Sequence, residues 1–327
     1  MNGLVPTVGL IVNPAAGRDI RRLVAKGRFV PDEEKVNIVE RILAGLFAAG
    51  VARVIAMPDS AGLTRAAASE HAGAMDLESL DIPIVGRERD SILAAKAMTD
   101  RGAACIVTLG GDGTNRAVAS AQLSVPLVPV STGTNNVFPI LVEGTMAGLA
   151  AGVVATGAVD PQAVTFSRPM LEVSVDGERR DIALIDAAVA RQQYIGARAI
   201  WNADQIAELF VSGIYPTSIG LASIASRLPA EPGRGMHIRL GEGGVVVSAP
   251  ITPGTFQAVQ VARWSTLPFG EPQEVSLDSG TLAVDGERSV AFYPGQKASV
   301  TLVERGPSVV CVEKALELAG RAGAFVS

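Results

Sequence analysis

The chain is poor in aromatic residues, which make up only 4% of its 327 residues. Binding of single-stranded nucleic acid depends on aromatic rings on which bases stack, so this sequence offers little surface for it. The net charge is −5, and no sustained block of basic residues forms a stripe for a phosphate backbone. We therefore expect no nucleic-acid partner, and we expect any anionic ligand to be bound by a local group of residues.

Cysteine and histidine are also scarce, with two of each. Cys105 and Cys311 each lie in an apolar run, which favours buried thiols in a reducing cytoplasm over a disulfide. HExxH and CxxC motifs are absent, so we expect no zinc site and interpret His71 and His237 as structural. A GxSxG motif is missing too, which argues against a serine hydrolase.

Long apolar runs are missing as well. The N-terminal MNGLVPTVGLIVNP has no basic flank and passes directly into a strand-like run, so no signal peptide is predicted. The small and apolar stretch 146–159 contains glycines and is shorter than the roughly 18 to 20 residues of a membrane helix. With 48% hydrophobic residues available for cores, the sequence predicts a soluble, cytoplasmic globular protein without a membrane partner.

The first half alternates short apolar runs with longer amphipathic segments, the pattern of a parallel sheet covered by helices. Strands are expected at 9–12, 53–57, 82–85, 105–109 and 126–130. Helices are expected within 31–50, 90–100 and 142–155, and after the glycine cluster near residue 111. Residues 1–160 are therefore predicted to form a Rossmann-like α/β domain, with ligands at the carboxyl ends of its strands.

Beyond Pro161 the sequence changes to short, β-branched runs separated by Gly, Pro and Asp. This pattern predicts a β-rich, antiparallel, sandwich-like domain over 161–310, and the final 311–327 is expected to be a helix that packs on the first domain. The string VDGER occurs twice, at Val175–Arg179 and Val284–Arg288. Asp-Gly suits the tight turn of a β-hairpin, so we interpret both copies as turns.

The stretch VTLGGDGTNRAVAS, residues 107–120, places three glycines around Asp112 directly after an apolar run. Gly110 and Gly111 can adopt positive φ and let the backbone approach a ligand. A helix opening at Thr114 and Asn115 would present free amides to phosphate oxygens. A carboxylate there would hold Mg²⁺ or accept a proton from a hydroxyl nucleophile, which indicates phosphoryl transfer. The alternative is a glycine-rich turn capped by Asp112.

Three segments carry a family resemblance in this order: VNPAAG at 12–17, GGDGT at 110–114 and PVSTGTNNVFP at 129–139. They resemble the NAD kinase and diacylglycerol kinase superfamily, whose members join a Rossmann-like domain to a β-rich domain with the active site between them. The segments 183–202 and 218–228 look most like the ATP-NAD kinase relatives named for acetoin-catabolism protein X. The resemblance thus spans nearly the whole chain.

The resemblance implies roles for individual residues. Asp112 would be the catalytic carboxylate, and Glu287, within Asp285-Gly286-Glu287, would lie near the acceptor hydroxyl as in lipid kinases; a plain surface turn is the alternative. The residues expected to face or support the nucleotide are Asn13, Gly17, Gly110, Gly111, Gly113, Thr114, Asn115, Thr132, Gly133, Thr134, Asn135 and Asn136. Arg18, Arg21 and Arg22 would clamp phosphates or simply form a solvated helix face.

Asp186 stands out for a different reason, because an ionised group inside the apolar run ALIDAAVA needs a partner or a purpose. We assign it to the cofactor-binding set. After the glycine cluster, the segment RAVASAQLS lacks the Asn-Glu pair with which NAD kinases hold their substrate. The acceptor therefore stays open between the NAD 2′-hydroxyl and another small alcohol.

We therefore predict a kinase that uses ATP and Mg²⁺ to phosphorylate the hydroxyl group of a small molecule. Polyphosphate remains an alternative phosphoryl donor. Two other functions remain: a lipid kinase, and a nucleotide-binding regulator that has lost transfer. The resemblance further implies a homo-oligomer.

Overall fold

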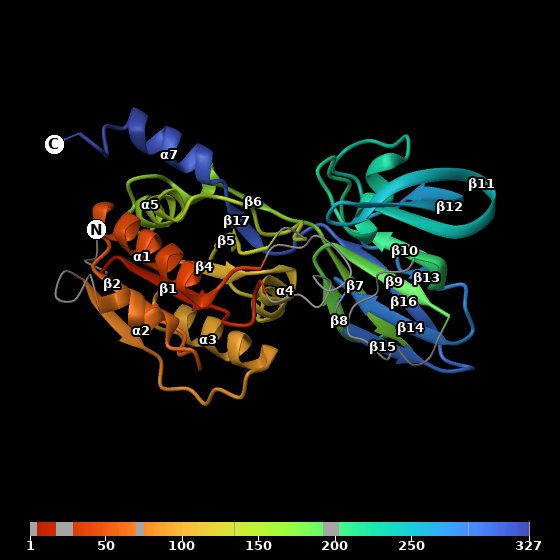
Figure 1. Ribbon diagram of the computed structural model, residues 1–327, viewed down its shortest axis with the longest axis horizontal. Coiled ribbons are helices and arrows are strands. Elements are labelled where there is room, and N and C mark those ends of the chain that lie inside the picture. The colour runs from red at the N-terminus through yellow and green to blue at the C-terminus, as the bar shows by residue number, and fades with distance from the viewer. Residues whose placement is uncertain are drawn as a thin grey trace.

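The computed structural model describes residues 5–17, 29–69, 75–133, 135–191, 203–286 and 288–326. They form two lobes, an α/β lobe that contains most of the first half of the chain and a β-rich lobe built from the second half (Figure 1). The fold is therefore a Rossmann-like α/β unit joined to an antiparallel β unit, as the sequence predicts.

A seven-stranded sheet forms the centre of the α/β lobe. Six of its strands are parallel, and the last one at the β6 edge is antiparallel to its neighbour. In spatial order the strands are β3 (Asp76–Ser79), β2 (Arg53–Ala56), β1 (Thr7–Val12), β4 (Cys105–Gly110), β5 (Leu127–Ser131), β17 (Ser308–Val310) and β6 (Thr165–Ser167). Buried β1, β4 and β5 lie side by side, so the loops that follow them meet at one edge.

Helices cover both faces of this sheet. One apolar core joins it to α1 (Asp32–Ala48), α2 (Leu63–Ala68), α5 (Gly144–Ala155) and α7 (Val312–Arg321). A second core joins the opposite face to α3 (Glu88–Asp100) and α4 (Asp112–Ser120). Helix α5 consists of small and apolar residues and lies close against α1, because a Cβ on Gly148 would lie 2.1 Å from the carbonyl oxygen of Ile42.

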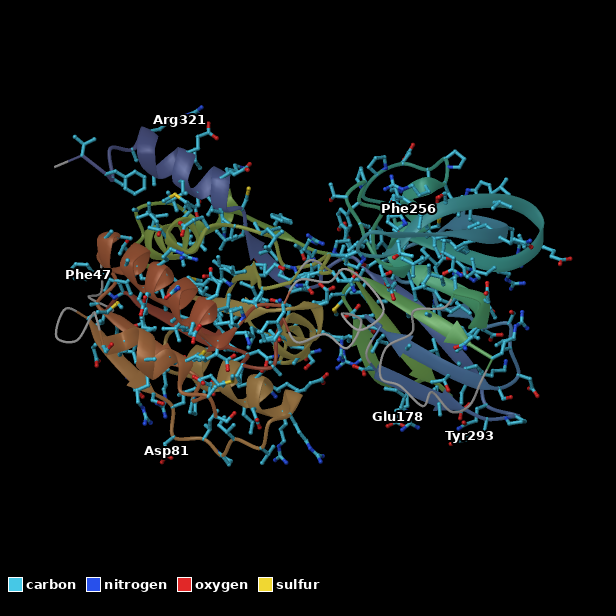
Figure 2. All side chains as sticks on the ribbon, viewed as in Figure 1. Phe47, Asp81, Glu178, Phe256, Tyr293 and Arg321 are labelled. Carbon is cyan, nitrogen blue, oxygen red and sulfur yellow. The ribbon has the colours of Figure 1, made fainter. Side chains whose placement is uncertain are left out.

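The β-rich lobe contains two fully antiparallel sheets. The larger has the order β12 (Thr255–Thr266), β11 (Met236–Thr252), β10 (Ile206–Val211), β9 (Asp186–Ala190), β14 (Gly280–Val284) and β15 (Arg288–Phe292). The smaller has the order β13 (Gln273–Glu274), β16 (Ala298–Val303), β7 (Met170–Val175) and β8 (Glu178–Ala183). A common core between them makes a sandwich. Figure 2 labels Glu178 and Tyr293 at the rim of this lobe.

Within the described residues, four short helical elements complete the two lobes, one in the α/β lobe and three in the β-rich lobe. They are α6 (Pro161–Val164) and the 3-10 helices η3 (Ala203–Gln205), η4 (Leu221–Ser223) and η5 (Ala225–Arg227). Apolar residues of η4 and η5 cover the face of the larger sheet that points away from the smaller one.

Two local predictions were wrong. Residues 82–85 form no strand, and the third strand is β3, which lies a few residues earlier. Pro83 lacks the amide that a strand needs, although Ile82 and Ile84 still pack on the second core. Helix α4 begins at Asp112, two residues before the predicted start at Thr114.

The chain crosses between the lobes more than once. Strand β6 follows the predicted boundary and β17 precedes the C-terminal helix, yet both belong to the sheet of the α/β lobe. Helix α7 then packs against α5. The domain limits at 160 and 310 stay a prediction. Across the described ranges, every helix is too short or too polar to cross a bilayer.

Candidate functional site

Three loops come together at the carboxyl ends of the central strands of the α/β lobe. We call them the first loop, residues 13–17 after β1, the second loop, residues 111–115 after β4, and the third loop, residues 132–138 after β5. Their meeting follows directly from the strand order β1-β4-β5. The predicted residues of these loops are therefore neighbours in space.

Asn13 connects the first loop to the second. Its backbone amide donates to the carbonyl oxygen of Leu109 at 3.0 Å, and its side-chain Nδ2 donates to Thr114 Oγ1 at 2.8 Å. Its Oδ1 accepts from the amide of Ala15 at 2.9 Å, which shapes the turn after β1. Asn13 is thus held at both ends of its side chain and fixes the spacing between two loops.

Asp112 connects the second loop to the third. Its carboxylate accepts hydrogen bonds from the backbone amides of Val137, at 3.1 Å, and Phe138, at 2.8 Å. The side chain is half-buried and lies in the first turn of α4, where the helix dipole favours a negative charge. The carboxylate therefore has a fixed position at the junction of the two loops.

The glycines of the second loop do not have the positive φ that we expected. Gly110, Gly111 and Gly113 are absent from the described residues with φ above zero, and Gly111 has φ −100°. Glycine is needed here for space instead: a Cβ on Gly110 would lie 2.6 Å from Thr114 Oγ1, and one on Gly111 would lie 2.9 Å from Asn136 Oδ1. Gly110 thus leaves room for Thr114 of its own segment, and Gly111 lets the second loop approach Asn136 of the third.

Asn115 points into the protein. Its Oδ1 accepts from Thr108 Oγ1 at 2.7 Å, its Nδ2 donates to the carbonyl oxygen of Gly111 at 2.9 Å, and the residue is fully buried. Thr114 is also buried and accepts from Asn13. Both residues belong to the second loop, and their buried side chains fix its position against β4 and the first loop.

Ser131, which sequence reasoning missed, organises the third loop. Its hydroxyl donates to the carbonyl oxygen of Gly133 at 3.0 Å and accepts from Asn136 Nδ2 at 2.8 Å. Thr132 is buried, and within the described part of the chain its Oγ1 has no hydrogen-bond partner. Asn135 is half-buried, while Thr134 lies outside the described residues.

Gly17 ends the described part of the first loop and has φ 74°, a conformation that glycine adopts at little cost. A Cβ there would lie 3.1 Å from Val30 Cβ. The arginines Arg18, Arg21 and Arg22, predicted as a phosphate clamp, lie outside the described residues.

Lys35 of α1 holds the first loop from below, and sequence reasoning missed it. Its fully buried Nζ donates to the carbonyl oxygen of Pro14 at 2.6 Å and to Asp32 Oδ1 at 3.1 Å. The available signal was its position four residues before Val39, on the face of α1 that is otherwise apolar.

Arg116 of α4 was also missed, and it connects the two lobes. Its side chain is 2% exposed and reaches Glu88 Oε1 at 2.5 Å, Asp181 Oδ1 at 3.2 Å and Asp285 Oδ2 at 3.5 Å. Glu88 belongs to α3, Asp181 to β8, and Asp285 follows β14. One buried guanidinium thus joins the helix of the second loop to the β-rich lobe.

Asp285 and Asp186, both singled out from the sequence, belong to this lobe junction. The Asp285 carboxylate accepts from the amides of Leu184, Ile185 and Asp186, and its own amide donates to the carbonyl oxygen of Asp186 at 2.9 Å. Burial raises the pKa of Asp285 to about 6, although Arg116 and the three amides oppose that shift. Asp186 is buried beside it at the start of β9, and Glu287 lies outside the described residues.

Comparison with known proteins identifies both halves of the chain. Residues 8–158 match the model of the ATP-NAD kinase N-terminal domain, and residues 169–305 match that of the acetoin catabolism protein X C-terminal domain. Acetoin catabolism protein X of Cupriavidus necator is 41% identical over 97% of this chain and 93% of its own length.

A crystal structure of an NAD kinase from Archaeoglobus fulgidus in complex with ATP covers 84% of this chain and 98% of its own. Its sequence identity is 15% and its TM-score 0.41, so this likeness carries no argument about the site. The family follows from the sequence matches, which place a kinase-type domain in the first half and a protein X domain in the second. The chain belongs to the acetoin catabolism protein X family.

Proposed function

We propose that this protein is an ATP-dependent kinase that transfers the γ-phosphoryl group to a hydroxyl of a small molecule. The match of residues 8–158 to the ATP-NAD kinase N-terminal domain supports the donor and the reaction class. The observation that carries the proposal is the position of Asp112, half-buried in the first turn of α4 and held by the third loop.

Each loop has a part in this reaction. The first turn of α4 offers backbone amides and a favourable dipole for phosphate oxygens. Asp112 would orient the attacking hydroxyl and accept its proton as the bond to phosphorus forms. Asn13, whose side chain bridges the first two loops, and Asn136, which donates to Ser131 at the base of the third loop, would keep the phosphate-binding backbone in one geometry. Catalysis would come mainly from positioning.

The residues present fit a Mg²⁺ that arrives with the nucleotide. Mg²⁺ is usually held by one or two carboxylates together with substrate phosphates and water, and Asp112 can supply one such carboxylate. A site made by the protein alone is not required, and the described residues contain no cluster of three His, Cys, Asp or Glu side chains for a metal ion. When bound, the ion would neutralise charge on the transferred phosphoryl group.

The acceptor is either the NAD 2′-hydroxyl or another small alcohol. The test is nucleotide consumption by the full chain against a panel of NAD and polyols, with ATP and polyphosphate as donors. For Asp112→Ala we expect transfer to fall by about 10²-fold or more while nucleotide binding persists. Asp176→Ala, which changes an exposed aspartate of the β-rich lobe, is the matched control.

The outcomes separate the candidate functions. Unchanged turnover in Asp112→Ala would remove the proposed role of this carboxylate. Formation of NADP would identify NAD as the acceptor, and binding of ATP without turnover on any acceptor would support the regulator. Light scattering of the purified chain would test the expected homo-oligomer.

A lipid kinase remains the second candidate, and one observation favours it. The ion pair between Arg116 and Asp285 brings the Asp285-Gly286 turn against the helix that carries the second loop. This turn carries the Asp-Gly-Glu string that resembles lipid kinases, in which the glutamate lies near the acceptor hydroxyl. Diacylglycerol in mixed micelles therefore belongs in the acceptor panel, and phosphorylation of this lipid alone would favour the lipid kinase.

A further inference from the structure

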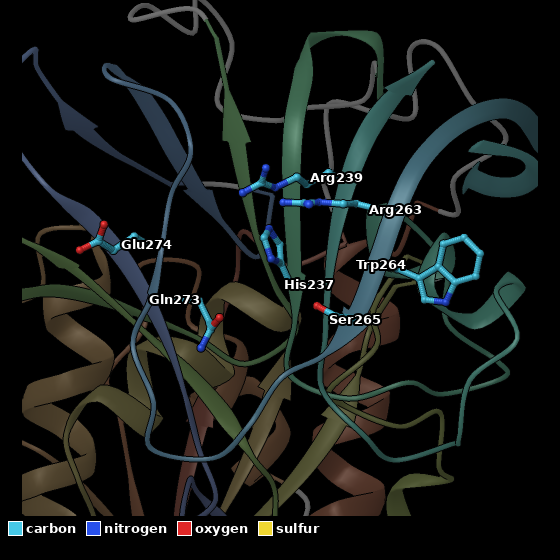
Figure 3. Close-up of a pocket in the computed structure, with 7 residues that line it drawn as sticks. All are labelled: His237, Arg239, Arg263, Trp264, Ser265, Gln273 and Glu274. Atoms are coloured by element: carbon cyan, nitrogen blue, oxygen red, sulfur yellow. The ribbon is translucent and has the colours of Figure 1, made fainter. Parts of the chain in front are cut away.

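A second site of interest lies in the β-rich lobe, where a pocket of about 350 Å³ opens between strands β11 and β12 on one side and β13 on the other (Figure 3). Two arginines, Arg239 of β11 and Arg263 of β12, line it together with His237. Its volume is near the lower limit for small-molecule sites, which are mostly about 300 to 1,000 Å³.

The two arginines form a directly opposed cross-strand pair. Figure 3 shows both side chains extending from the two strands in the same direction in this view. Like charges in directly opposed positions destabilise a sheet, so this pair costs stability unless an anion compensates it.

The nearest carboxylate compensates this charge only in part. Glu208 of β10 is 1% exposed, and its Oε2 lies 3.9 Å from Arg239 Nε, beyond hydrogen-bonding distance. The same carboxylate accepts from the amide of Ser276 at 2.7 Å and from its hydroxyl, and pairs with His237 Nε2 at 2.7 Å. Burial opposes ionisation, but these hydrogen bonds lower the pKa of Glu208, so it stays charged and occupied.

Donor groups of both arginines therefore remain available. The Arg239 side chain is 34% exposed, and its two terminal nitrogens form no hydrogen bond or ion pair with a described residue, while its buried Nε lies beside Glu208. Arg263 is exposed and has no ion pair within the described ranges. The acidic residue of the opposite wall, Glu274, has its own cation, because Lys297 Nζ lies 3.5 Å from it.

His237 adds a rigid wall. Its ring stacks on Phe210 with centroids 4.2 Å apart and planes 5° from parallel, and Glu208 holds its Nε2. The imidazole cannot turn away without losing both contacts, so the shape of the pocket beside the arginines is fixed.

We propose that this pocket binds the phosphoryl group of a small phosphorylated molecule. A phosphate dianion matches two guanidinium charges and has enough oxygens for both planar donor groups, whereas a single carboxylate matches only one. The site is distinct from the three loops. The part of the β-rich lobe that contacts the helix of the second loop is the Asp285 turn after β14. In the larger sheet β11 lies three strands from β14, so at the usual strand spacing about 14 Å separate the pocket strand β11 from β14. The proposal does not depend on the kinase function.

Calorimetric titration of the full chain with inorganic phosphate and with glycerol phosphate, at low ionic strength, tests this site. Acetate serves as the monoanionic comparison. Arg263→Gln should raise the Kd of both phosphate compounds at least about tenfold, because it removes a charge-assisted donor. Arg305→Gln, which removes an exposed arginine elsewhere in the same half of the chain, should leave it unchanged.

Melting temperature provides a second readout that excludes misfolding. Without ligand, Arg263→Gln should melt at the wild-type temperature or higher, since it relieves the repulsion from Arg239. Phosphate should stabilise the wild type and Arg305→Gln but not Arg263→Gln. Equal phosphate affinity in wild type and Arg263→Gln, no binding at millimolar phosphate, or equally tight binding of acetate would each overturn the proposal.

Discussion

Two hairpins of this molecule share the sequence VDGER and place its Asp and Gly in the same region of φ. In Val175–Arg179, Asp176 has φ 54° and Gly177 has φ 78°; in Val284–Arg288, Asp285 has φ 48° and Gly286 has φ 71°. Each loop joins two antiparallel strands, and positive φ at both central residues of the two-residue loop after Val175 is the mark of a type I′ turn. The registers differ, because Val175 pairs with Glu178 whereas Val284 pairs with Arg288, so the second loop is one residue longer. The local sequence therefore determines the positive φ of Asp and Gly in both copies, but not the length of the loop.

The surroundings of the two turns differ completely. Asp176 is exposed and accepts from the amide of Lys297 at 2.9 Å and from Gln296 Nε2 at 3.0 Å. Asp285 is 8% exposed, caps three amides and faces Arg116 from the other lobe. A short motif specifies conformation, whereas the place of the motif in the fold specifies its electrostatics.

The largest expected effect comes from removing the cation at the buried turn. Arg116→Met leaves Glu88, Asp181 and Asp285 facing one another without their shared partner. We expect a loss of about 3 to 5 kcal/mol in the free energy of unfolding, measured by urea denaturation.

Arg179, at the exposed turn, forms a surface ion pair with Glu172 at 2.9 Å. The matched change there is Arg179→Met. This variant should lose less than about 1 kcal/mol. Equal losses in the two variants would show that the buried network does not stabilise the junction of the lobes.

The next effect is a pH dependence that only the buried turn should show. The pKa of Asp285 rises from 3.8 to about 6 on folding, so the folded state binds this proton more tightly than the unfolded state. The resulting stabilisation is complete below pH 4 and is lost as the pH rises through 6. Its size is roughly 3 kcal/mol, from about 1.4 kcal/mol per pKa unit.

Urea unfolding of the wild type and Asp285→Asn from pH 4 to 7 measures this contribution as the difference between two curves, because other carboxyl groups titrate in both. Asparagine keeps an acceptor for the amides and tolerates positive φ. The free energy of unfolding of Asp176→Asn should depend on pH as that of the wild type does. If the free energy of Asp285→Asn also ran parallel to the wild type over this pH range, the raised pKa of Asp285 would be refuted.

These contrasts also explain which parts of the fold could be predicted. Both hairpins follow from Asp-Gly between alternating runs, and the parallel order of β1, β4 and β5 follows from apolar runs separated by helices. The return of β17 to the first sheet could not be predicted, because the three residues Ser-Val-Val do not specify a partner strand more than 100 residues away. Pro83 argues against a strand at 82–85, because it has no amide to donate, but the apolar character of this run led to the wrong prediction.

For the candidate site, the sequence predicted the three loops but not the contacts within them. The order of the motifs placed Asn13, Asp112 and Asn136 at one edge of the sheet. The amides of Val137 and Phe138, which receive Asp112, could not be identified, since they lie 25 and 26 residues away and carry no side-chain signal. Arg116 was overlooked because it follows the conspicuous glycines and its partners come from distant strands.

A third and smaller effect is the difference in stability lost when each aspartate, and with it the hydrogen bonds that it accepts, is removed. Asp285→Ala leaves the buried amides of Leu184, Ile185 and Asp186 without their acceptor, whereas the amide of Lys297 that Asp176 caps is exposed and can turn to water. Both variants place alanine at positive φ, so that cost cancels in the comparison. Asp285→Ala should be about 2 kcal/mol less stable than Asp176→Ala by urea unfolding, and equal stabilities would contradict the capping role.

The smallest effect should be the same at both turns. Alanine at Gly177 meets no atom within 4 Å, so Gly177→Ala has only the conformational cost of a φ of 78°, about 1 kcal/mol. Gly286 has almost the same φ, and Gly286→Ala should cost the same within about 0.5 kcal/mol if the turn alone decides. Urea unfolding of the two variants measures this directly. A much larger loss at Gly286 would show that close packing at the lobe junction, and not only charge, distinguishes the buried copy from the exposed one.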